Sequence, residues 1–203
     1  MGVDILWRNR AVGLTDPNPG DKVCDMCCGT GDLTGEFLKT SNSPAEIVGC
    51  DFSEEMIELA KKKFRDKPIA FSVQDCTSTN FQNEYFDIVS CAFGVRNLKD
   101  LDAGLHEMNR ILKPEGKICI LEFSLPTNKL IRCMYLLYFK YVLPVIGGII
   151  TFDMSAYRYF VKSVIDWNNN TDLKEKLKEK GFETILKEPL TFGIATIHIA
   201  QKK

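Results

Sequence analysis

The stretch "VCDMCCGTGDLTGEF", residues 23–37, joins a hydrophobic strand to a helix through a glycine-rich turn. Such a turn lets the backbone approach a ligand closely, and in many α/β proteins it binds phosphate at the start of the helix. Here Asp25 precedes the turn, where its negative charge would repel a phosphate. The sequence therefore predicts a strand–turn–helix unit whose ligand is not a phosphate.

Two phosphate-binding motifs can be tested against this turn. A P-loop requires Gly-x-x-x-x-Gly-Lys-Ser/Thr, and no lysine lies between Lys22 and Lys39. The dinucleotide fingerprint Gly-x-Gly-x-x-Gly/Ala starts at Gly29 and Gly31, but its third position is Thr34. Neither motif is complete, which again argues against a phosphate ligand.

Strands and helices are predicted to alternate along the rest of the chain. Apolar runs bounded by turn residues predict further strands at 45–51, 69–75, 86–93 and 117–123. Amphipathic patterns predict helices at 32–40, 53–66, 98–112 and 171–181. Ser53 is expected to cap the second of these helices, and Pro114 and Gly116 are expected to end the third. With a closing hairpin at 182–189 and 192–201, the pattern predicts an α/β, doubly wound, mostly parallel sheet.

The balance of charges argues against general nucleic-acid binding. The 203 residues carry 26 basic and 27 acidic side chains, for a net charge of −1, so no field of one sign attracts a polyanion. The length and a hydrophobic fraction of 45% fit one globular domain, residues 1–203. The opening residues "MGVDILWRNR" mix acidic and basic side chains and do not resemble a secretory signal.

The eight cysteines predict free thiols rather than a metal site. Four lie in apolar, strand-like runs, where a thiol usually acts as a small buried hydrophobe: Cys24, Cys50, Cys91 and Cys119. The cluster Cys24-x-x-Cys27-Cys28 has the spacing of half a zinc site, but the chain has only two histidines and no second close pair of cysteines. No metal is therefore expected, and free thiols indicate a reducing, cytoplasmic setting.

Acidic residues end three consecutive predicted strands. Asp25 ends the first, Asp51 ends the second and Asp75 ends the third. Because the carboxyl ends of parallel strands meet at one edge of a sheet, we expect these carboxylates to face one ligand. S-adenosylmethionine fits them, since Asp25 would face its cationic amino-acid end, Asp51 its ribose hydroxyls and Asp75 its adenine amino group. The alternative is that Asp25 caps the following helix and that the other two acids are solvated in loops.

Several stretches of this chain resemble those of one enzyme family. They are "GVDILWR" (2–8), "CCGTGDLTGEF" (27–37), "FGVRNLKDLDAGLHEMNRILKPEGKICILEFSLP" (93–126), "YVLPVIGGIITFDMSAYRYFVKSV" (141–164) and "GFETILKEPLTFGIATIH" (181–198). The chain resembles class I S-adenosylmethionine-dependent methyltransferases and, within them, the ubiquinone/menaquinone biosynthesis C-methyltransferase family. The resemblance covers nearly the whole chain, and residues 110–124 are its most specific part.

Three positions depart from the family pattern. Glu115 replaces a glycine that is usual in the family, Cys27 stands where most class I enzymes have their first glycine, and Ala92 stands where a serine is common. Cys27 and Ala92 are both small, so we expect weaker cofactor affinity rather than lost binding. The family also normally has a further segment before residue 2, which is expected to contribute to the lid.

The resemblance implies a Rossmann-like, seven-stranded sheet with a helical lid, at about 126–170, inserted between the fifth and sixth strands. It implies S-adenosylmethionine as the cofactor, held by Asp25, Gly29, Thr30, Gly31, Asp51, Phe52, Met56, Asp75, Cys76 and Ala92. It implies substrate contacts by Phe93, Arg96 and Tyr157, with Arg96 and Asn97 as catalytic residues. A guanidinium is a poor base, so Arg96 is expected to bind the quinolate oxygen or to polarise a water. The alternative is a structural arginine in an ion pair.

The implied reaction transfers a methyl group to a ring carbon of a polyprenylated quinol, either demethylmenaquinol or the benzoquinol precursor of ubiquinone. The reduced ring is electron-rich at carbon, so the protein must align the reactants, exclude water and stabilise the developing quinolate. The turn at 93–97 lacks the Asn/Asp-Pro-Pro-aromatic pattern of enzymes that methylate nucleobase amino groups, so nucleic acid is not an expected partner. Two alternatives stay open: a methyltransferase of another lipid-like small molecule, and a silent cofactor-binding subunit of a quinone-synthesis complex.

Residues 130–152, "LIRCMYLLYFKYVLPVIGGIITF", form a mostly apolar stretch of 23 residues, long enough to be considered as a membrane span. Arg132 and Lys140 interrupt it, Pro144 breaks it, and both of its ends must return to the same sheet, which argues against a single span. We expect a lid over the quinol site that contacts the membrane surface. The alternative is a helix packed on the core or in a homodimer interface. The expected location is cytoplasmic and peripheral at the inner face of the membrane.

Overall fold

The computed structural model describes residues 2–142 and 154–203, apart from the side chains of 140, 142 and 154–158. Contacts between residues divide the chain into two compact units. The first comprises Met1–Glu122, Leu173–Glu188 and Ile197–Lys203, and the second comprises Phe123–Asp172 and Pro189–Thr196. The predicted cofactor residues all belong to the first unit, and the predicted lid belongs to the second.

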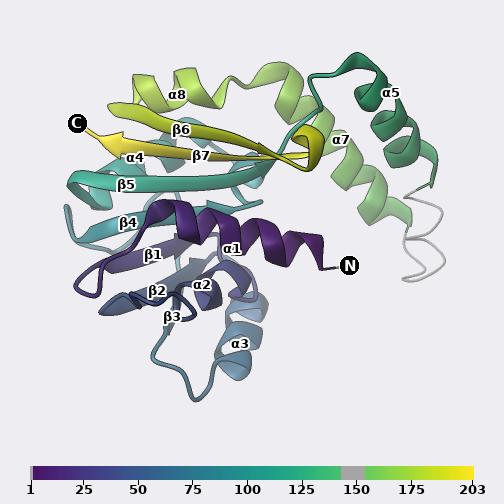
Figure 1. The fold of residues 1–203 in the computed structure, drawn as a ribbon. Helices are drawn as coiled ribbons and strands as arrows, with labels where there is room; N and C mark the ends of the chain where they lie inside the picture. Colours follow the sequence, from purple (N-terminus) through teal and green to yellow (C-terminus); the bar gives the residue numbers. More distant parts are fainter. Residues whose placement is uncertain (1, 143–153) are drawn as a thin grey trace. The chain divides into compact units, whose positions relative to one another are not determined.

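A seven-stranded sheet has the order β3-β2-β1-β4-β5-β7-β6 (Figure 1). Its strands are β1 (Lys22–Met26), β2 (Glu46–Asp51), β3 (Ala70–Val73), β4 (Phe86–Ala92), β5 (Leu112–Phe123), β6 (Phe182–Leu190) and β7 (Ala195–Lys202). β1 pairs in parallel with β2 and β4, β2 with β3, and β4 with β5. The short turn η3 (Thr191–Gly193) joins the neighbours β6 and β7, so these two strands run antiparallel. The predicted mostly parallel sheet with a closing hairpin is confirmed.

The order of the strands places a crevice beside β1 and β4. From β1 the chain moves outward to β2 and β3, then returns to the other side of β1 to form β4. β1 and β4 are buried along nearly their whole length, which is why their sequences are continuous apolar runs. In open α/β sheets ligands bind outside the carboxyl ends of the strands at such a switch point.

Helices cover both faces of the part of the sheet that belongs to the first unit. They are α1 (Val3–Thr15), α2 (Asp32–Phe37), α3 (Glu54–Lys63), α4 (Leu101–Ile111) and α8 (Leu173–Glu179). α1 packs beside α2 on one face, while α4 lies on the opposite face with α8 beside it (Figure 1). The connections β1-α2-β2 and β4-α4-β5 run in opposite directions along the sheet. Because such crossovers are right-handed, their helices lie on opposite faces. The predicted cap of α3 is confirmed, since Ser53 Oγ accepts a hydrogen bond from Met56 N at 3.3 Å.

Two features of the first unit differ from the sequence prediction. Helix α1 was not predicted, and its apolar side chains are not confined to one face: Val3, Ile5 and Leu6 are exposed. Strand β5 begins at Leu112 instead of the predicted Lys117 and therefore runs through Pro114, although α4 ends before this proline as expected. A shift of register between β4 and β5 at this point, with φ +63° at Glu115, accommodates the proline in a bulge.

The second unit is mainly helical in its described part. It contains α5 (Lys129–Leu137), the π-helical turn η2 (Tyr138–Val142) and α7 (Met154–Asn170). Tyr135 and Phe139 are buried in a cluster with Val161 and Val164, with the rings of Tyr135 and Phe139 4.4 Å apart at their centroids. Residues 143–153 of the predicted lid lie outside the described residues. Across the described residues, no helix combines the length and the apolar character that crossing a membrane requires.

Candidate functional site

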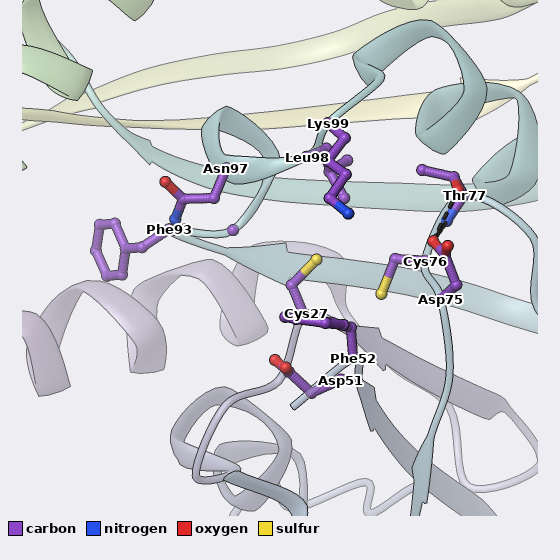
Figure 2. Close-up of a pocket in the computed structure, with 11 residues that line it drawn as sticks. Cys27, Asp51, Phe52, Asp75, Cys76, Thr77, Phe93, Asn97, Leu98 and Lys99 are labelled. Carbon is purple, nitrogen blue, oxygen red and sulfur yellow. Dashed lines mark hydrogen bonds between the residues drawn. The ribbon is translucent and has the colours of Figure 1, made fainter. Parts of the chain in front are cut away.

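A cavity of about 320 Å³ lies at the carboxyl ends of β1 to β4. Its wall is formed by Cys27, Asp51, Phe52, Asp75, Cys76, Thr77, Phe93, Gly94, Asn97, Leu98 and Lys99. Figure 2 shows these residues on the turns that follow the strands, with Cys27, Cys76 and Lys99 pointing into the space between the turns. The observed strand order therefore places Asp51 and Asp75 on the wall of one cavity.

A second cavity of about 160 Å³ adjoins the first. It is lined by Arg8, Asp25, Cys27, Cys28, Gly29, Thr30, Asp32, Leu33, Ala92 and Phe93. Cys27 and Phe93 belong to both walls. The two cavities together form an elongated site with Asp25 at one end and Asp75 at the other.

The glycine turn after β1 is held in a left-handed conformation. Gly29 has φ +53° and Gly31 has φ +79°, values that glycine adopts at little cost. A Cβ atom at Gly31 would lie 2.9 Å from Cζ of Phe71, so this position also lacks room for a side chain. Cys27 has φ +55° without being a glycine, which costs a side-chain-bearing residue on the order of 1–2 kcal/mol. The turn is thus built around backbone conformations that bring its amide groups close to the ligand.

Asp51 links this turn to the start of α3. Its Oδ2 accepts a hydrogen bond from Gly29 N at 2.9 Å, and its Oδ1 accepts one from Ser53 N at 2.9 Å. Each carboxylate oxygen has a second lone pair, so Asp51 can still accept hydrogen bonds from a ligand. The predicted ribose residue therefore also fixes the shape of the turn.

Asp75 is exposed at the far end of the larger cavity. Its Oδ1 accepts hydrogen bonds from Thr77 Oγ1 at 2.7 Å and from Thr77 N at 2.9 Å. These hydrogen bonds lower the pKa of Asp75. Its carboxylate is therefore ionised and available as an acceptor at neutral pH.

Asp25 is fully buried at the wall of the smaller cavity. Its Oδ2 accepts a hydrogen bond from Thr34 Oγ1 at 2.6 Å and its Oδ1 accepts one from Ser90 Oγ at 2.9 Å. Burial raises the pKa of Asp25 to about 7, although the two hydrogen bonds and the charge of Arg8 act in the opposite direction. A cation that enters this cavity would favour the ionised form of Asp25. The contact also explains why Thr34 stands at the third position of the incomplete dinucleotide fingerprint.

The turn after β4 carries the predicted substrate residues. Asn97 lines the larger cavity and its Nδ2 donates to Phe93 O at 3.4 Å. The guanidinium of Arg96 forms an ion pair with Glu122, with Nη1 2.6 Å from Oε1, and both side chains are less than one-tenth exposed. The same Nη1 donates to Phe93 O at 2.6 Å. Phe93 has φ +59°, so Arg96 stabilises the carbonyl of a residue in an unfavourable conformation.

Most of the predicted cofactor residues line one of the two cavities. Gly31 and Met56 do not, and they instead shape the turn and the first turn of α3. Tyr157 belongs to α7, but its side chain lies outside the described residues. Nine lining residues were not predicted as site residues from the sequence: Arg8, Cys27, Cys28, Asp32, Leu33, Thr77, Gly94, Leu98 and Lys99.

Arg8 could have been predicted as a site residue, because it lies in the stretch "GVDILWR" that resembles the family. Its guanidinium carbon lies 5.4 Å from the centroid of the Phe93 ring, and the neighbouring Trp7 ring lies 6.3 Å from the same centroid. Helix α1 therefore brings a cation to the smaller cavity and packs an aromatic ring near Phe93. Sequence reasoning could not place them because it did not predict this helix.

The chemistry of the donor set fits S-adenosylmethionine. Carboxylates occupy both ends and the middle of the elongated site, while Phe52 and Leu98 supply apolar surface to the larger cavity. Acceptors suit an ammonium, a ribose diol and an adenine amino group, and apolar side chains suit a purine ring. Among the described residues, no group of three or more His, Cys, Asp or Glu side chains could hold a metal ion.

Comparison with known sequences gives a match along almost the whole chain. A family model described as "ubiE/COQ5 methyltransferase family" matches residues 1–202. The "Ubiquinone/menaquinone biosynthesis C-methyltransferase UbiE" of Geobacter sulfurreducens is 39% identical over 206 residues, covering 100% of this chain and 80% of that protein. The protein of the same description from Geotalea uraniireducens is 40% identical, covering 100% of this chain and 87% of that protein.

Solved structures share the fold at low sequence identity. A chain of the complex between the Haloferax volcanii Trm112 methyltransferase activator and a putative methyltransferase has a TM-score of 0.71 at 15% identity, covering 98% of this chain and 91% of its own length. The phosphoethanolamine N-methyltransferase 2 of Haemonchus contortus, solved with S-adenosylmethionine, has a TM-score of 0.68 at 17% identity, covering 96% of this chain and 52% of its own length. At these identities the likeness concerns the fold alone.

Proposed function

The chain belongs to the ubiE/COQ5 methyltransferase family, and we propose that it transfers the methyl group of S-adenosylmethionine to a ring carbon of a polyprenylated quinol. The protein is thus a methyltransferase. The proposal names demethylmenaquinol or the benzoquinol precursor of ubiquinone as the acceptor. The bacterial relatives are described as ubiquinone/menaquinone biosynthesis C-methyltransferases, which supports an acceptor from either pathway.

The observation that carries this proposal is the set of three carboxylates along one elongated site. Asp25 lies in β1, Asp51 ends β2 and Asp75 follows β3, and the three line two adjoining cavities. A pyrophosphate would meet like charge along its whole length, whereas a sulfonium with an ammonium and a diol meets acceptors. The relatives are described as C-methyltransferases, which favours an active enzyme over a silent cofactor-binding subunit.

We assign the parts of the cofactor to the two cavities by charge and polarity. Asp51 would hold the ribose, and Asp75 with Phe52 and Cys76 the adenine, since these residues line the larger cavity. Asp25 would attract the ammonium in the smaller cavity, and Arg8, which lines the same cavity, would attract the carboxylate. When bound, S-adenosylmethionine supplies a methyl group already activated by the positively charged sulfur.

The chain's own task is to orient the quinol and to stabilise its oxygen. Asn97 donates one weak hydrogen bond to Phe93 O, and its amide has a second N–H that could donate to the quinolate oxygen. Phe93 lines both cavities and offers its ring to the quinol. We propose that Arg96 is a positioning residue, which holds the 93–97 turn through Phe93 O and Glu122. A direct contact between Arg96 and the quinol stays a prediction, because the guanidinium would have to leave Glu122.

A transfer assay tests the proposed reaction. Purified protein is incubated with methyl-labelled S-adenosylmethionine and chemically reduced short-chain demethylmenaquinol or its benzoquinol counterpart, and products are identified by mass. We expect label on a ring carbon of at least one quinol, with much less product from Asp51→Ala. Glu58→Ala, which removes an exposed acid on α3, is the matched control. Cofactor binding without transfer to either quinol would contradict the proposal.

We further propose that α5 contacts the membrane surface, from which a polyprenylated substrate must come. Three of its apolar side chains face solvent: Leu130 is 71% exposed, Met134 64% and Leu137 54%. Lys129 and Arg132 lie on the same helix, and basic residues beside an apolar face favour anionic lipid headgroups. The proposed location is accordingly peripheral at the cytoplasmic face of the membrane. A homodimer through this face is the competing proposal.

A further inference from the structure

Helix α1 carries two arginines, and each is paired with an acid in a different setting. The side chain of Arg10 is 56% exposed, and its Nε and Nη2 donate to the two carboxylate oxygens of Glu188 at 2.8 and 2.9 Å. The side chain of Arg8 is only 16% exposed, and its Nη1 donates to Oδ2 of Asp4, one helical turn earlier, at 2.5 Å. Arg8 lines the smaller cavity, whereas neither Arg10 nor Glu188 belongs to the walls of the two cavities described above. The pair of Asp4 and Arg8 is therefore placed at the site, and the other pair is not.

The guanidinium of Arg8 is held from two directions. Its carbon lies 5.4 Å from the centroid of the Phe93 ring, a distance at which a cation is attracted to an aromatic ring. Its Nη1 is held by Asp4. A guanidinium has five N–H donors in one plane, so this hydrogen bond leaves other donors for an anion in the cavity. Asp4 and Phe93 thus fix Arg8 without using up its capacity to bind a carboxylate.

The smaller cavity presents charges of both signs to a ligand. Asp25 is fully buried in its wall, and Arg8 lines the same cavity. Burial raises the pKa of Asp25 to about 7, and the charge of Arg8 acts in the opposite direction, so the two groups lie within electrostatic reach of one another. A ligand with an ammonium alone would suit Asp25 but would meet the like charge of Arg8. A ligand that carries an ammonium and a carboxylate side by side would suit both residues.

We propose that Asp4 is a positioning residue for Arg8, and that this pair makes the smaller cavity selective for a ligand whose ammonium lies beside a carboxylate. Without Asp4 the long side chain of Arg8 is free to adopt other rotamers, and ordering it again on binding costs conformational entropy. The side chain of Asp4 is 45% exposed, so solvent screens its repulsion of a bound carboxylate while its hydrogen bond keeps Arg8 in place. Because the ligand is S-adenosylmethionine, this inference rests on the proposed function.

Calorimetry with two nucleosides tests the selectivity. S-adenosylhomocysteine carries the ammonium and the carboxylate, and its decarboxylated analogue, S-adenosylthiopropylamine, carries the ammonium alone. We expect the wild type to bind S-adenosylhomocysteine at least about tenfold more tightly, since only this ligand forms a charge-assisted hydrogen bond with Arg8. Arg8→Gln should bind the two nucleosides with similar affinities. Similar affinities in the wild type would overturn the proposed selectivity.

Asp4→Asn tests the positioning role, because it keeps the shape of the side chain and removes its charge. We expect it to weaken the binding of S-adenosylhomocysteine by at least about threefold and to leave the affinity for the decarboxylated analogue unchanged. Asp4→Glu can still pair with Arg8 one helical turn away, so it should restore most of the affinity. Glu188→Gln, which removes the acidic partner of Arg10, is the matched control and should bind both nucleosides as the wild type does. Unchanged or tighter binding of S-adenosylhomocysteine by Asp4→Asn would overturn the positioning role.

Steady-state kinetics and thermal denaturation separate positioning from a structural defect. In the transfer assay, Asp4→Asn should raise KM for S-adenosylmethionine while kcat stays near that of the wild type, because only binding of the amino-acid end is changed. A fall of kcat together with Tm, with weaker binding of both nucleosides, would show a structural role and overturn the inference. Absence of transfer to either quinol by the wild type would contradict the proposed function, whereas the calorimetric comparison of the two nucleosides would still decide the role of Asp4.

Discussion

The carboxyl edge of the sheet and helix α5 distribute polar and apolar side chains in opposite ways. At the edge, charged groups are buried: Asp25 is fully enclosed and Arg96 forms an ion pair with Glu122. On α5, large apolar side chains such as Leu130 and Leu137 face solvent. Buried charges and exposed apolar groups both cost stability in an isolated domain. Each region thus points to a ligand, a cationic one at the edge and an apolar one at the helix.

The largest effect is expected from Arg96→Ala, which tests whether a buried charge holds the edge together. Removing one partner of a buried ion pair leaves the other uncompensated, so we expect the free energy of unfolding to fall by about 3–5 kcal/mol. Turnover with a reduced quinol should fall sharply, while cofactor affinity stays near that of the wild type. Urea denaturation, calorimetry and the transfer assay measure the three quantities.

Glu122→Gln separates the two possible roles of Arg96. If Arg96 positions the 93–97 turn, loss of its carboxylate partner should also lower turnover, because the guanidinium loses its anchor. Wild-type turnover in a folded Glu122→Gln variant, beside low turnover in Arg96→Ala, would instead favour direct contact with the quinol. Arg96→Lys should rescue poorly in either case, since a point charge does not reproduce the planar guanidinium.

Asp25→Asn tests the buried charge at the other end of the site through its pH dependence. Burial raises the pKa of Asp25 to about 7, so the folded protein binds this proton more tightly than the unfolded chain does. The resulting stability is complete below about pH 4 and is lost as the pH rises through 7. From the pKa shift we expect the free energy of unfolding of the wild type to fall by about 4 kcal/mol between pH 4 and pH 8. The free energy of unfolding of Asp25→Asn should not show this decrease.

Denaturation curves at several pH values, compared between the wild type and the variant, isolate this contribution. Asp75→Asn serves as the control, because hydrogen bonds from Thr77 lower the pKa of that acid, so its removal should not reproduce the Asp25 effect. Parallel pH profiles of the wild type and Asp25→Asn would show that Asp25 titrates normally.

Asp51→Ala tests a half-buried acid of the carboxyl edge and should have a smaller free-energy effect than the preceding variants. Two charge-assisted hydrogen bonds to the ribose would be lost, so we expect cofactor binding to weaken by about 2 kcal/mol or more. Because Asp51 also accepts from Gly29 N and Ser53 N, Asp51→Asn is the informative companion, since it keeps one acceptor oxygen. Unchanged affinity of a folded Asp51→Ala protein by calorimetry would show that Asp51 serves only the turn.

The smallest effect on stability is expected on α5. Leu130 and Leu137 are mostly exposed, so Leu130→Asp/Leu137→Asp should change the free energy of unfolding by no more than about 0.5 kcal/mol. Co-sedimentation with anionic vesicles should nevertheless decrease, more clearly at low salt. Phe139→Asp is unsuitable for this test, because the Phe139 ring is buried against Tyr135 and Val161. Equal, negligible sedimentation of both proteins would leave core packing or a dimer interface as the role of the helix.

Local sequence patterns were sufficient for most of the sheet and for the acids at its edge. Apolar runs followed by Asp25, Asp51 and Asp75 predict strand ends because a buried parallel strand must be apolar until it emerges at the edge. The cap at Ser53 and the closing hairpin were predictable for the same local reason. The start of β5 was not, because the bulge that admits Pro114 depends on the pairing with β4.

Only the tertiary structure decided how individual side chains are used. The sequence placed Arg96 and Asn97 in one turn, but the fold directs Asn97 to the cavity and Arg96 to Glu122, which lies 26 residues later. It likewise brings Arg8 of an unpredicted helix to the cavity that Asp25 lines. The sequence determined the architecture because burial and periodicity are local properties of each segment. Contacts between distant segments depend on how the strands are ordered and how helices pack on them, and no local pattern specifies those.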